Sequence, residues 1–298
     1  MENSEKFFYL LYFILNFVCY ILVITSQFKS IVYLPLSFHI VQIISSGLSL
    51  FFLRKIRNKP GYIEKDDELD DTEIKDIKNN TNLEYSPIIY YNLMPNNGCE
   101  KCQIIKLPLR SHHCPKCNKC VKGFDHHCWI LAGCVGENNR FMFILFLLFQ
   151  NISIFYSAYG VIKLMNRQLD ELLIYILTLI FSVNCLFEII FFFVFIYHIY
   201  LLITNQTTYE IFNEDQCPYL SIFTLERKKI LAQRGIVIND NIRFRPFDSG
   251  FIKNISLYFK IIFHSQSSIK WNEMYFENLR TNYINLNCGD RAILNLNK

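Results

Sequence analysis

Three residues of one tetrapeptide have the types and spacing of a nucleophile with its own base. Asp125, His126 and Cys128 lie in the run Asp125-His126-His127-Cys128. A cysteine thiol becomes a strong nucleophile when an adjacent imidazole takes its proton and a third group orients that imidazole. In an extended strand, neighbouring side chains point to opposite faces, so His126 and Cys128 would share the face that His127 leaves. We expect Cys128 to be the nucleophile, His126 its base and Asp125 the residue that orients His126.

The same tetrapeptide lies within a dense set of metal-ligand candidates. Seven cysteines and four histidines fall between Cys99 and Cys134, and several cysteines are paired at Cys-x-x-Cys spacing. Zinc prefers four tetrahedral Cys or His ligands, and such pairs can grip one ion from a tight turn. Two ions would use eight of these candidates, which leaves room for a cysteine that is not a ligand. Sequential and interleaved assignments use the same residues, so spacing alone leaves the partition between the two ions open.

Composition indicates a membrane protein rather than a soluble one. Of the 298 residues, 52% are hydrophobic and 28 are phenylalanine, so much of the chain should face lipid. A formal charge of +4 is too small to imply a nucleic-acid partner, and none is expected. The clustered cysteines lie in a charged, non-secretory context, which favours metal binding over disulfides.

Four apolar runs are long enough to cross a membrane, and their positions decide where Cys128 lies relative to it. They cover residues 7–25, 31–53, 141–162 and 172–203, and each reaches the roughly 20 residues that a membrane-spanning helix needs. The fourth run is too short for two spans and is predicted to be one tilted helix. The first run lacks a basic leader and a small-residue cleavage site, which favours a retained anchor over a signal peptide. The third run begins only thirteen residues after Cys128, so the nucleophile should lie at the membrane surface.

The loops between the spans fix the expected orientation. Short loops join the first span to the second and the third to the fourth, so the N-terminus and both long segments share one side. Arg54, Lys55, Arg57 and Lys59 follow the second span directly, and this positive bias predicts a cytosolic location. Free thiols and thiolate ligands also persist best in the reducing cytosol.

The predicted fold is an all-α membrane protein, a four-helix transmembrane bundle with a cytosolic, zinc-binding, cysteine-rich domain of short β-hairpins. The expected divisions are spans one and two (1–53), a charged cytosolic linker (54–98), the cysteine-rich zinc domain (99–140), spans three and four (141–203) and a cytosolic tail (204–298).

Ordered motifs along the chain resemble those of the DHHC family of zinc-containing, multi-pass protein S-acyltransferases (palmitoyltransferases). CEKCQIIKLPLRSHHCPKCNKCVKGFDHHC and CVGENNRFMF carry the domain-level resemblance. TTYE at residues 207–210 resembles the family's TTxE motif, and PFDSG at residues 246–250, with Asn254, resembles its C-terminal motif.

The resemblance implies a ligand partition and a reaction. It implies a first structural zinc on Cys99, Cys102, His113 and Cys120, and a second on Cys114, Cys117, His127 and Cys134. Cys128 would take a fatty acyl group, palmitoyl or another long chain, from acyl-coenzyme A and pass it to a substrate cysteine. Thr207, Thr208, Glu210 and Asn254 would have supporting roles, either at the active site or as helix caps and packing residues. His112 is left without a role.

The implied partners are acyl-coenzyme A, the lipid bilayer and proteins with membrane-proximal cytosolic cysteines. The expected location is an endomembrane (Golgi or endoplasmic reticulum) or the plasma membrane, with both termini and the cysteine-rich domain in the cytosol. The sequence does not choose between these membranes.

Three positions depart from the family pattern. Trp129 and Ile130 stand where Pro and Trp usually follow the catalytic cysteine, and Gly133 replaces a usual Asn. None removes a ligand or a catalytic residue, but Ile130 occupies a slot near the family's acyl path. Two other functions remain open: a zinc-stabilised membrane scaffold without catalysis, and a RING-like ubiquitin ligase, whose two-zinc ligand order spreads over a longer segment.

Overall fold

The computed structural model describes the chain in several stretches that form two compact units. These stretches are residues 34–58, 60–63, 98–104, 107–166, 171–233, 244–263 and 271–280, with isolated residues 14, 17, 18, 20, 21, 235 and 269. The first unit comprises Met1–Lys59, His127–Val135 and Asn139–Tyr200, and the second comprises Pro60–His126, Gly136–Asn138 and Leu201–Lys298. The division falls inside the tetrapeptide, between His126 and His127.

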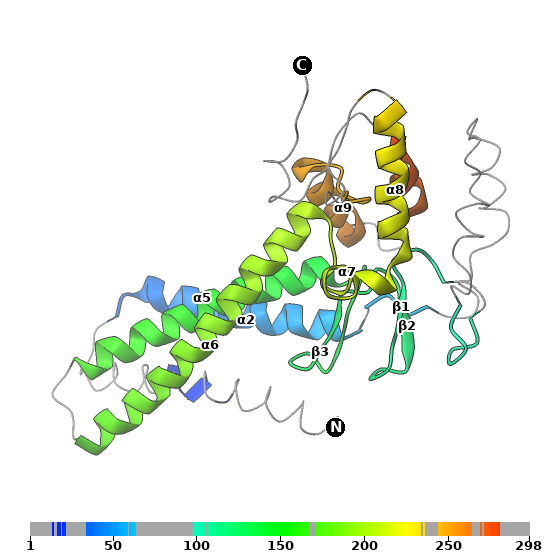
Figure 1. Cartoon of the computed structure of the whole chain (residues 1–298). Coiled ribbons are helices and arrows are strands. Elements are labelled where there is room, and N and C mark those ends of the chain that lie inside the picture. Colours follow the sequence, from blue (N-terminus) through cyan, green and yellow to red (C-terminus); the bar gives the residue numbers. More distant parts are fainter. Residues whose placement is uncertain are drawn as a thin grey trace. The chain divides into compact units, whose positions relative to one another are not determined.

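Three long helices of the first unit are apolar and long enough to cross a membrane. They are α2 (Leu36–Asn58), α5 (Arg140–Met165) and α6 (Glu171–Thr204), whose last four residues belong to the second unit (Figure 1). The 34 residues of α6 form one continuous helix of about 51 Å, as predicted for the fourth run. The predicted first span, residues 7–25, lies almost entirely outside the described residues. The structure therefore supports three spans and does not test the predicted count of four.

The second span lies further along the chain than its apolar run. Helix α2 begins directly after Pro35, and the Phe38 amide donates to the Pro35 carbonyl oxygen at 2.9 Å. Proline disfavours a helical residue before it and suits the first helical turn, which explains the start. The helix continues five residues beyond Leu53, where Lys55 and Arg57 lie in its last turn and favour its negative end.

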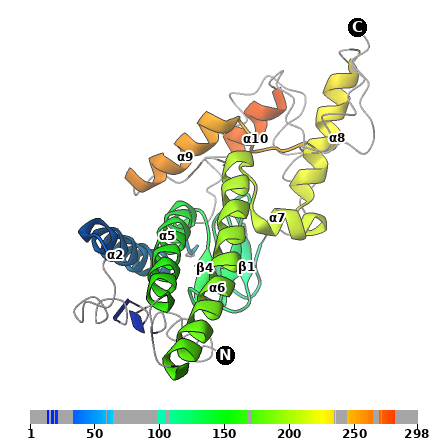
Figure 2. The same ribbon diagram turned by 90° about the vertical axis from the view of Figure 1, so that its left-hand side faces the viewer.

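Polar side chains join α2 to α5, which lie side by side (Figure 2). The Gln42 Nε2 group donates to Ser157 Oγ at 3.0 Å, and the hydroxyls of Ser46 and Ser153 lie 2.8 Å apart. In lipid there is no hydrophobic force between apolar helices, so small residues and hydrogen bonds of this kind hold spans together.

The cysteine-rich segment forms very short strands. Strand β1 (His112–Cys114) pairs antiparallel with β2 (Lys119–Val121), and β3 (His126–Cys128) pairs with β4 (Gly133–Val135). His113 lies directly opposite Cys120 in the first hairpin. The predicted short hairpins are therefore present. Two-stranded hairpins of three residues are not stable by themselves in water, so other interactions must hold them.

The second unit also contains the helices that follow the membrane spans. They are α7 (Thr208–Phe212), the 3-10 turn η2 (Glu214–Gln216), α8 (Pro218–Gln233), α9 (Phe251–Phe263) and α10 (Trp271–Arg280). A single apolar core joins the loop before β1 to these helices. It includes Leu109, Cys217, Tyr219, Phe223, Leu231, Phe244, Phe247, Trp271 and Tyr275.

A glycine marks the place where three backbone segments of the second unit meet. The Lys122 amide donates to the Gly61 carbonyl oxygen at 2.8 Å, and the Glu137 amide donates to the Lys122 carbonyl oxygen at 2.9 Å. A Cβ atom on Gly136 would lie 2.5 Å from the Pro60 carbonyl oxygen and 2.9 Å from that of Lys122. Only glycine allows this close approach.

Candidate active site and metal ligands

Four predicted zinc ligands of the second unit converge on one point. The His113 Nδ1 atom lies 3.5 Å from Cys99 Sγ, 3.3 Å from Cys102 Sγ and 3.8 Å from Cys120 Sγ. Zinc–nitrogen and zinc–sulfur bonds of roughly 2.1 and 2.3 Å place tetrahedral N and S ligands about 3.6 Å apart. All four donor atoms lie within 4.8 Å of one another. The donor set and its spacing therefore fit one tetrahedral zinc ion.

Local backbone geometry brings these donors together. The amide of Cys99 donates to the Ile104 carbonyl oxygen at 2.7 Å, and the return bond is 3.0 Å, which closes a tight turn around Cys102. Gln103 in this turn has a positive φ of 57°. The pairing of His113 with Cys120 across the first hairpin supplies the other two ligands.

The two most buried thiols of this set differ in their electrostatics. Burial raises the pKa of Cys120. Burial acts in the same direction on Cys99, but hydrogen bonds from Cys102 and Cys120 outweigh it, so the pKa of Cys99 is lowered. Zinc ligands must be thiolates, so a bound cation would supply the charge that offsets the desolvation of Cys120.

Of the other four predicted ligands, two belong to each unit. In the second unit, the Cys117 amide donates to Cys114 Sγ at 3.5 Å. In the first unit, Cys134 Sγ lies 3.8 Å from His127 Nδ1. Each unit thus brings two of the predicted zinc donors of the second set close to each other.

Asp125 is held in place by three hydrogen bonds. The residue is 1% exposed, and its Oδ2 atom lies 2.7 Å from His126 Nδ1. The Thr208 amide donates to Oδ1 at 3.0 Å, and the Thr208 hydroxyl donates to Oδ2 at 2.8 Å. Because Nδ1 of His126 faces a carboxylate, it carries the proton, and Nε2 is left as the basic nitrogen.

The short helix α7 is the element that presents Thr208 to Asp125. Thr207 caps its N-terminus, because its hydroxyl accepts from the Glu210 amide at 3.1 Å while Glu210 Oε2 accepts from the Thr207 amide at 2.9 Å. This reciprocal pair is a capping box. The TTYE sequence therefore has both of the roles considered for it, as a helix cap and at the candidate active site. Thr207 and Glu210 cap a helix, and Thr208 contacts Asp125.

A buried ion pair anchors the capping box. The Arg110 Nε and Nη2 atoms donate to the two carboxylate oxygens of Glu210 at 2.8 and 2.7 Å. Both side chains are at most 2% exposed. Burial acts to lower the pKa of Arg110, but the Glu210 carboxylate outweighs this effect and raises it, so the guanidinium stays charged. The Arg110 carbonyl oxygen also accepts from the Phe124 amide at 3.0 Å, directly before Asp125.

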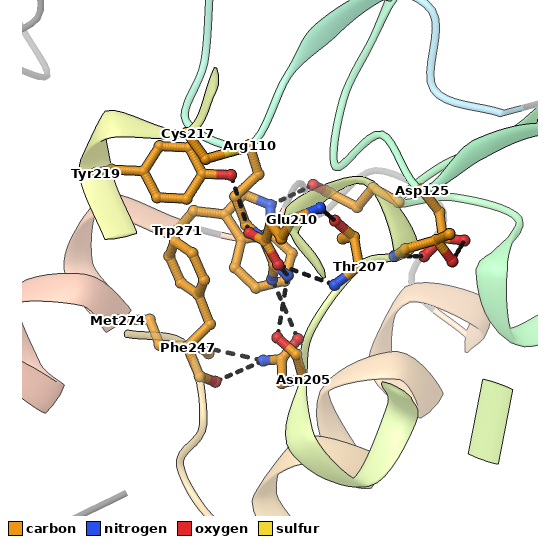
Figure 3. A network of polar contacts seen from close by, with 12 residues as sticks. Arg110, Asp125, Asn205, Thr207, Glu210, Cys217, Tyr219, Phe247, Trp271 and Met274 are labelled. Atoms are coloured by element: carbon orange, nitrogen blue, oxygen red, sulfur yellow. Dashed lines mark hydrogen bonds and ion pairs between the residues drawn. The ribbon is translucent and has the colours of Figure 1, made fainter. Parts of the chain in front are cut away.

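Sequence reasoning did not identify the residues that enclose this ion pair. Tyr219 donates its hydroxyl to Glu210 Oε1 at 3.0 Å, and Asn205 accepts from Arg110 Nη1 at 3.2 Å. The rings of Phe247 and Trp271 lie 4.2 and 4.4 Å from the Arg110 Cζ atom (Figure 3). The available signal for Arg110 was its place directly after the apolar run Leu107-Pro108-Leu109, because a charge beside buried apolar residues needs a partner.

Asn254 joins the last turn of α6 to the first turn of α9. Its Nδ2 group donates to the Ile203 carbonyl oxygen at 2.6 Å and to Asp248 Oδ1 at 2.8 Å, and its Oδ1 atom accepts from the Ser249 amide at 3.0 Å. Asn254 is 1% exposed, so its contacts are internal.

Cys128 lies in the first unit among apolar side chains. It is 6% exposed and belongs to a cluster with Ile56, Leu131 and Phe143. Ile130 packs against the same cluster, whereas Trp129 is 64% exposed. Of the two departures from the family pattern beside Cys128, Ile130 therefore packs in the same apolar cluster as Cys128, and Trp129 lies on the surface.

His112, the histidine without an assigned role, packs inside the second unit. Its ring lies 4.0 Å from that of Tyr209, and its Nε2 atom lies 4.0 Å from Cys217 Sγ. Burial lowers the pKa of His112 to about 4 and raises that of Cys217 to about 11. Both groups are neutral near pH 7 and act as packing residues.

Comparison with known proteins finds one family that resembles part of this chain. Residues 92–215 match the family model described as DHHC palmitoyltransferase. The match includes every predicted zinc ligand, the tetrapeptide and the TTYE motif, but not Asn254 or the helices after η2.

Curated relatives carry names of the same kind. The chain is 31% identical over 171 residues to putative ZDHHC-type palmitoyltransferase 7 of Dictyostelium discoideum, covering 54% of this chain and 34% of that protein. It is 33% identical over 167 residues to human palmitoyltransferase ZDHHC15, covering 54% and 43%. It is 28% identical over 216 residues to putative palmitoyltransferase ZDHHC13 of Danio rerio, covering 70% and 31%. Each match spans less than half of the relative's length.

Proposed function

We propose that the chain belongs to the DHHC family, whose model matches residues 92–215, and that it is a protein S-acyltransferase. It would move a long-chain fatty acyl group, such as palmitoyl, from acyl-coenzyme A through Cys128 to cysteines of other proteins. The observation that carries this proposal is the Asp125 carboxylate, which binds His126 Nδ1 at 2.7 Å while Thr208 fixes both of its oxygens.

The proposed first step forms an acyl-enzyme. His126 Nε2 takes the proton of the Cys128 thiol, and the sulfur attacks the thioester carbonyl carbon of acyl-coenzyme A. The bond from that carbon to the coenzyme A sulfur breaks, and the leaving thiolate takes the proton back from His126. In the second step a substrate cysteine attacks the acyl-Cys128 thioester in the same way, which restores the Cys128 thiol. The role of Asp125 is to hold His126 in the tautomer that can accept a proton at Nε2.

The proposed cofactors are two structural zinc ions. Cys99, Cys102, His113 and Cys120 would hold the first, and Cys114, Cys117, His127 and Cys134 the second. Closed sites with four protein ligands supply folding energy and take no part in bond making. In this domain they would fix hairpins that are too short to persist alone.

The three described spans make the protein a multi-pass membrane protein, and the remaining placement is proposed. We infer a fourth span at residues 7–25 and a cytosolic side that holds residues 54–140 and 204–298, with the divisions given above. The acyl chain would lie among the spans, where each buried methylene contributes about 0.8 kcal/mol. Substrates would then be proteins whose cytosolic cysteines lie close to the membrane.

Labelling with a tagged fatty acyl-coenzyme A tests this function. Purified wild-type protein should gain a hydroxylamine-labile label, and Cys128→Ser should gain none. Cys185→Ser is the matched control, because Cys185 is a partly buried cysteine of α6 and should label like the wild type. Equal labelling of Cys128→Ser and wild type would disprove the mechanism. A wild type that binds zinc but gains no label would favour the scaffold function.

A further inference from the structure

We propose that Trp271, on helix α10 beyond the matched domain, is a positioning residue for the acyl transfer inferred above. It would act on Asp125 through Arg110, Glu210 and Thr208. The inference rests on the proposed function and on contacts within the second unit only.

The Arg110 guanidinium lies in a corner formed by two aromatic rings. The Phe247 and Trp271 rings lie 4.2 and 4.4 Å from its Cζ atom and meet at 76°, while Glu210 and Asn205 bind the guanidinium (Figure 3). A buried cation over an aromatic face gains energy from the ring quadrupole, and most when it is desolvated. The ring of Trp271 therefore covers part of the buried guanidinium and limits the positions that it can take beside Glu210.

Trp271 is itself held by two sets of contacts. Its indole Nε1 group donates to Glu137 Oε2 at 2.6 Å, and the Ile269 amide donates to Glu137 Oε1 at 2.9 Å. Further along α10, the Tyr275 hydroxyl donates to the Tyr219 carbonyl oxygen at 3.1 Å, and Asn278 Nδ2 donates to the Pro246 carbonyl oxygen at 2.9 Å. Residues 271, 275 and 278 have the spacing of one helix face, so this face fixes the indole.

A continuous set of polar contacts leads from the indole to the base. Arg110 binds Glu210, Glu210 closes the capping box of α7, and α7 presents Thr208 to both oxygens of Asp125. Loss of the Trp271 ring lets water and alternative guanidinium positions into the Arg110 site. The Glu210 carboxylate then shifts, α7 loses its cap geometry, and Asp125 holds His126 less firmly. Chemistry slows because His126 spends less time aligned for proton transfer.

The experiment measures rates on Cys128 in the full-length protein. Acyl uptake from tagged acyl-coenzyme A and alkylation by iodoacetamide are each followed as single exponentials, so that rate constant and amplitude separate. Loss of folded protein lowers only the amplitude, whereas misplacement of the base lowers the rate constant. We expect Trp271→Ala to lower both rate constants about tenfold, as loss of one buried cation–π contact implies. Trp271→Phe keeps a ring over Arg110 and should stay within about threefold of wild type.

Two comparisons make the test specific. Glu277→Ala changes an exposed residue of the same helix and should keep the wild-type rate constant. In the background of Thr208→Val, which removes one donor to Asp125, Trp271→Ala should have little further effect, because both changes act through one contact set. Additive effects, or a wild-type rate constant in Trp271→Ala, would overturn the inference. If the wild type gains no acyl label, the proposed function fails, and the alkylation rates alone still decide the role of Trp271.

Discussion

The strongest stability prediction concerns the charge of Glu210. The change Glu210→Gln keeps the shape of the side chain and removes its negative charge. The Glu210 carboxylate accepts from Arg110 Nε at 2.8 Å, Arg110 Nη2 at 2.7 Å, the Thr207 amide at 2.9 Å and the Tyr219 hydroxyl at 3.0 Å. A glutamine offers one oxygen to these four donors and turns its own amide donors toward the others.

The magnitude follows from burial. Both members of the ion pair are at most 2% exposed, so the substitution leaves the buried Arg110 charge without the carboxylate that it binds. Breaking such a pair by removing one partner costs about 3–5 kcal/mol of unfolding free energy. For a chain of this size, that loss corresponds to a fall in Tm on the order of 10 °C.

Tryptophan fluorescence during heating in detergent is a direct assay. The chain has two tryptophans, and Trp271 is buried beside the ion pair, so its emission reports the unfolding of this region. The control is Glu226→Gln, which breaks a half-exposed pair with Lys229 at 2.8 Å and should cost less than about 1 kcal/mol. If both variants unfold within about 2 °C of wild type, the buried pair has no special stabilising role.

Three further predictions concern the metal ligands, the base and the first unit. Cys99→Ser should lower the zinc content from two ions to about one and reduce folded yield; two retained ions would contradict the ligand assignment. Thr208→Val should slow acyl uptake about tenfold at unchanged zinc content, because Asp125 loses a hydrogen bond; an unchanged rate would show that Thr208 does not position Asp125. Asn139→Ala should lower the free energy of unfolding, measured by heat or denaturant, by about 2 kcal/mol. The reason is that the buried carbonyl oxygens of Ile56 and Cys134 lose the donor that they share at 2.9 Å. A loss below about 0.5 kcal/mol would mean that water replaces the donor.

Local patterns in the sequence predicted the candidate ligands and the three described spans, whereas the partition of the ligands came from the family resemblance. Cys-x-x-Cys pairs act within a few residues, so the convergence of Cys99 and Cys102 with His113 follows from tight turns. Apolar runs likewise predict spanning helices, because backbone groups in lipid must be satisfied within the segment. The exact start of α2 required one further rule, the restriction that Pro35 places on the residue before it.

The parts that sequence did not predict depend on long-range contacts. Arg110 and Glu210 are 100 residues apart, and nothing in the local pattern of either residue specifies the other. Trp271 is a single indole in a polar, aromatic segment, and its contact with Arg110 depends on how α10 packs in the core of the second unit. Pairings of this kind are decided by tertiary packing, which local periodicity does not encode.

The close approach at Gly136 limits how this protein can evolve. Two of the atoms that a new Cβ would meet are carbonyl oxygens of Pro60 and Lys122, which cannot move aside as a side chain can. Every amino acid other than glycine would force the backbone at Pro60 and at Lys122 away from position 136. Position 136 therefore admits a single residue. In a library of all single substitutions, this position should be among the least tolerant, although no catalytic atom belongs to it.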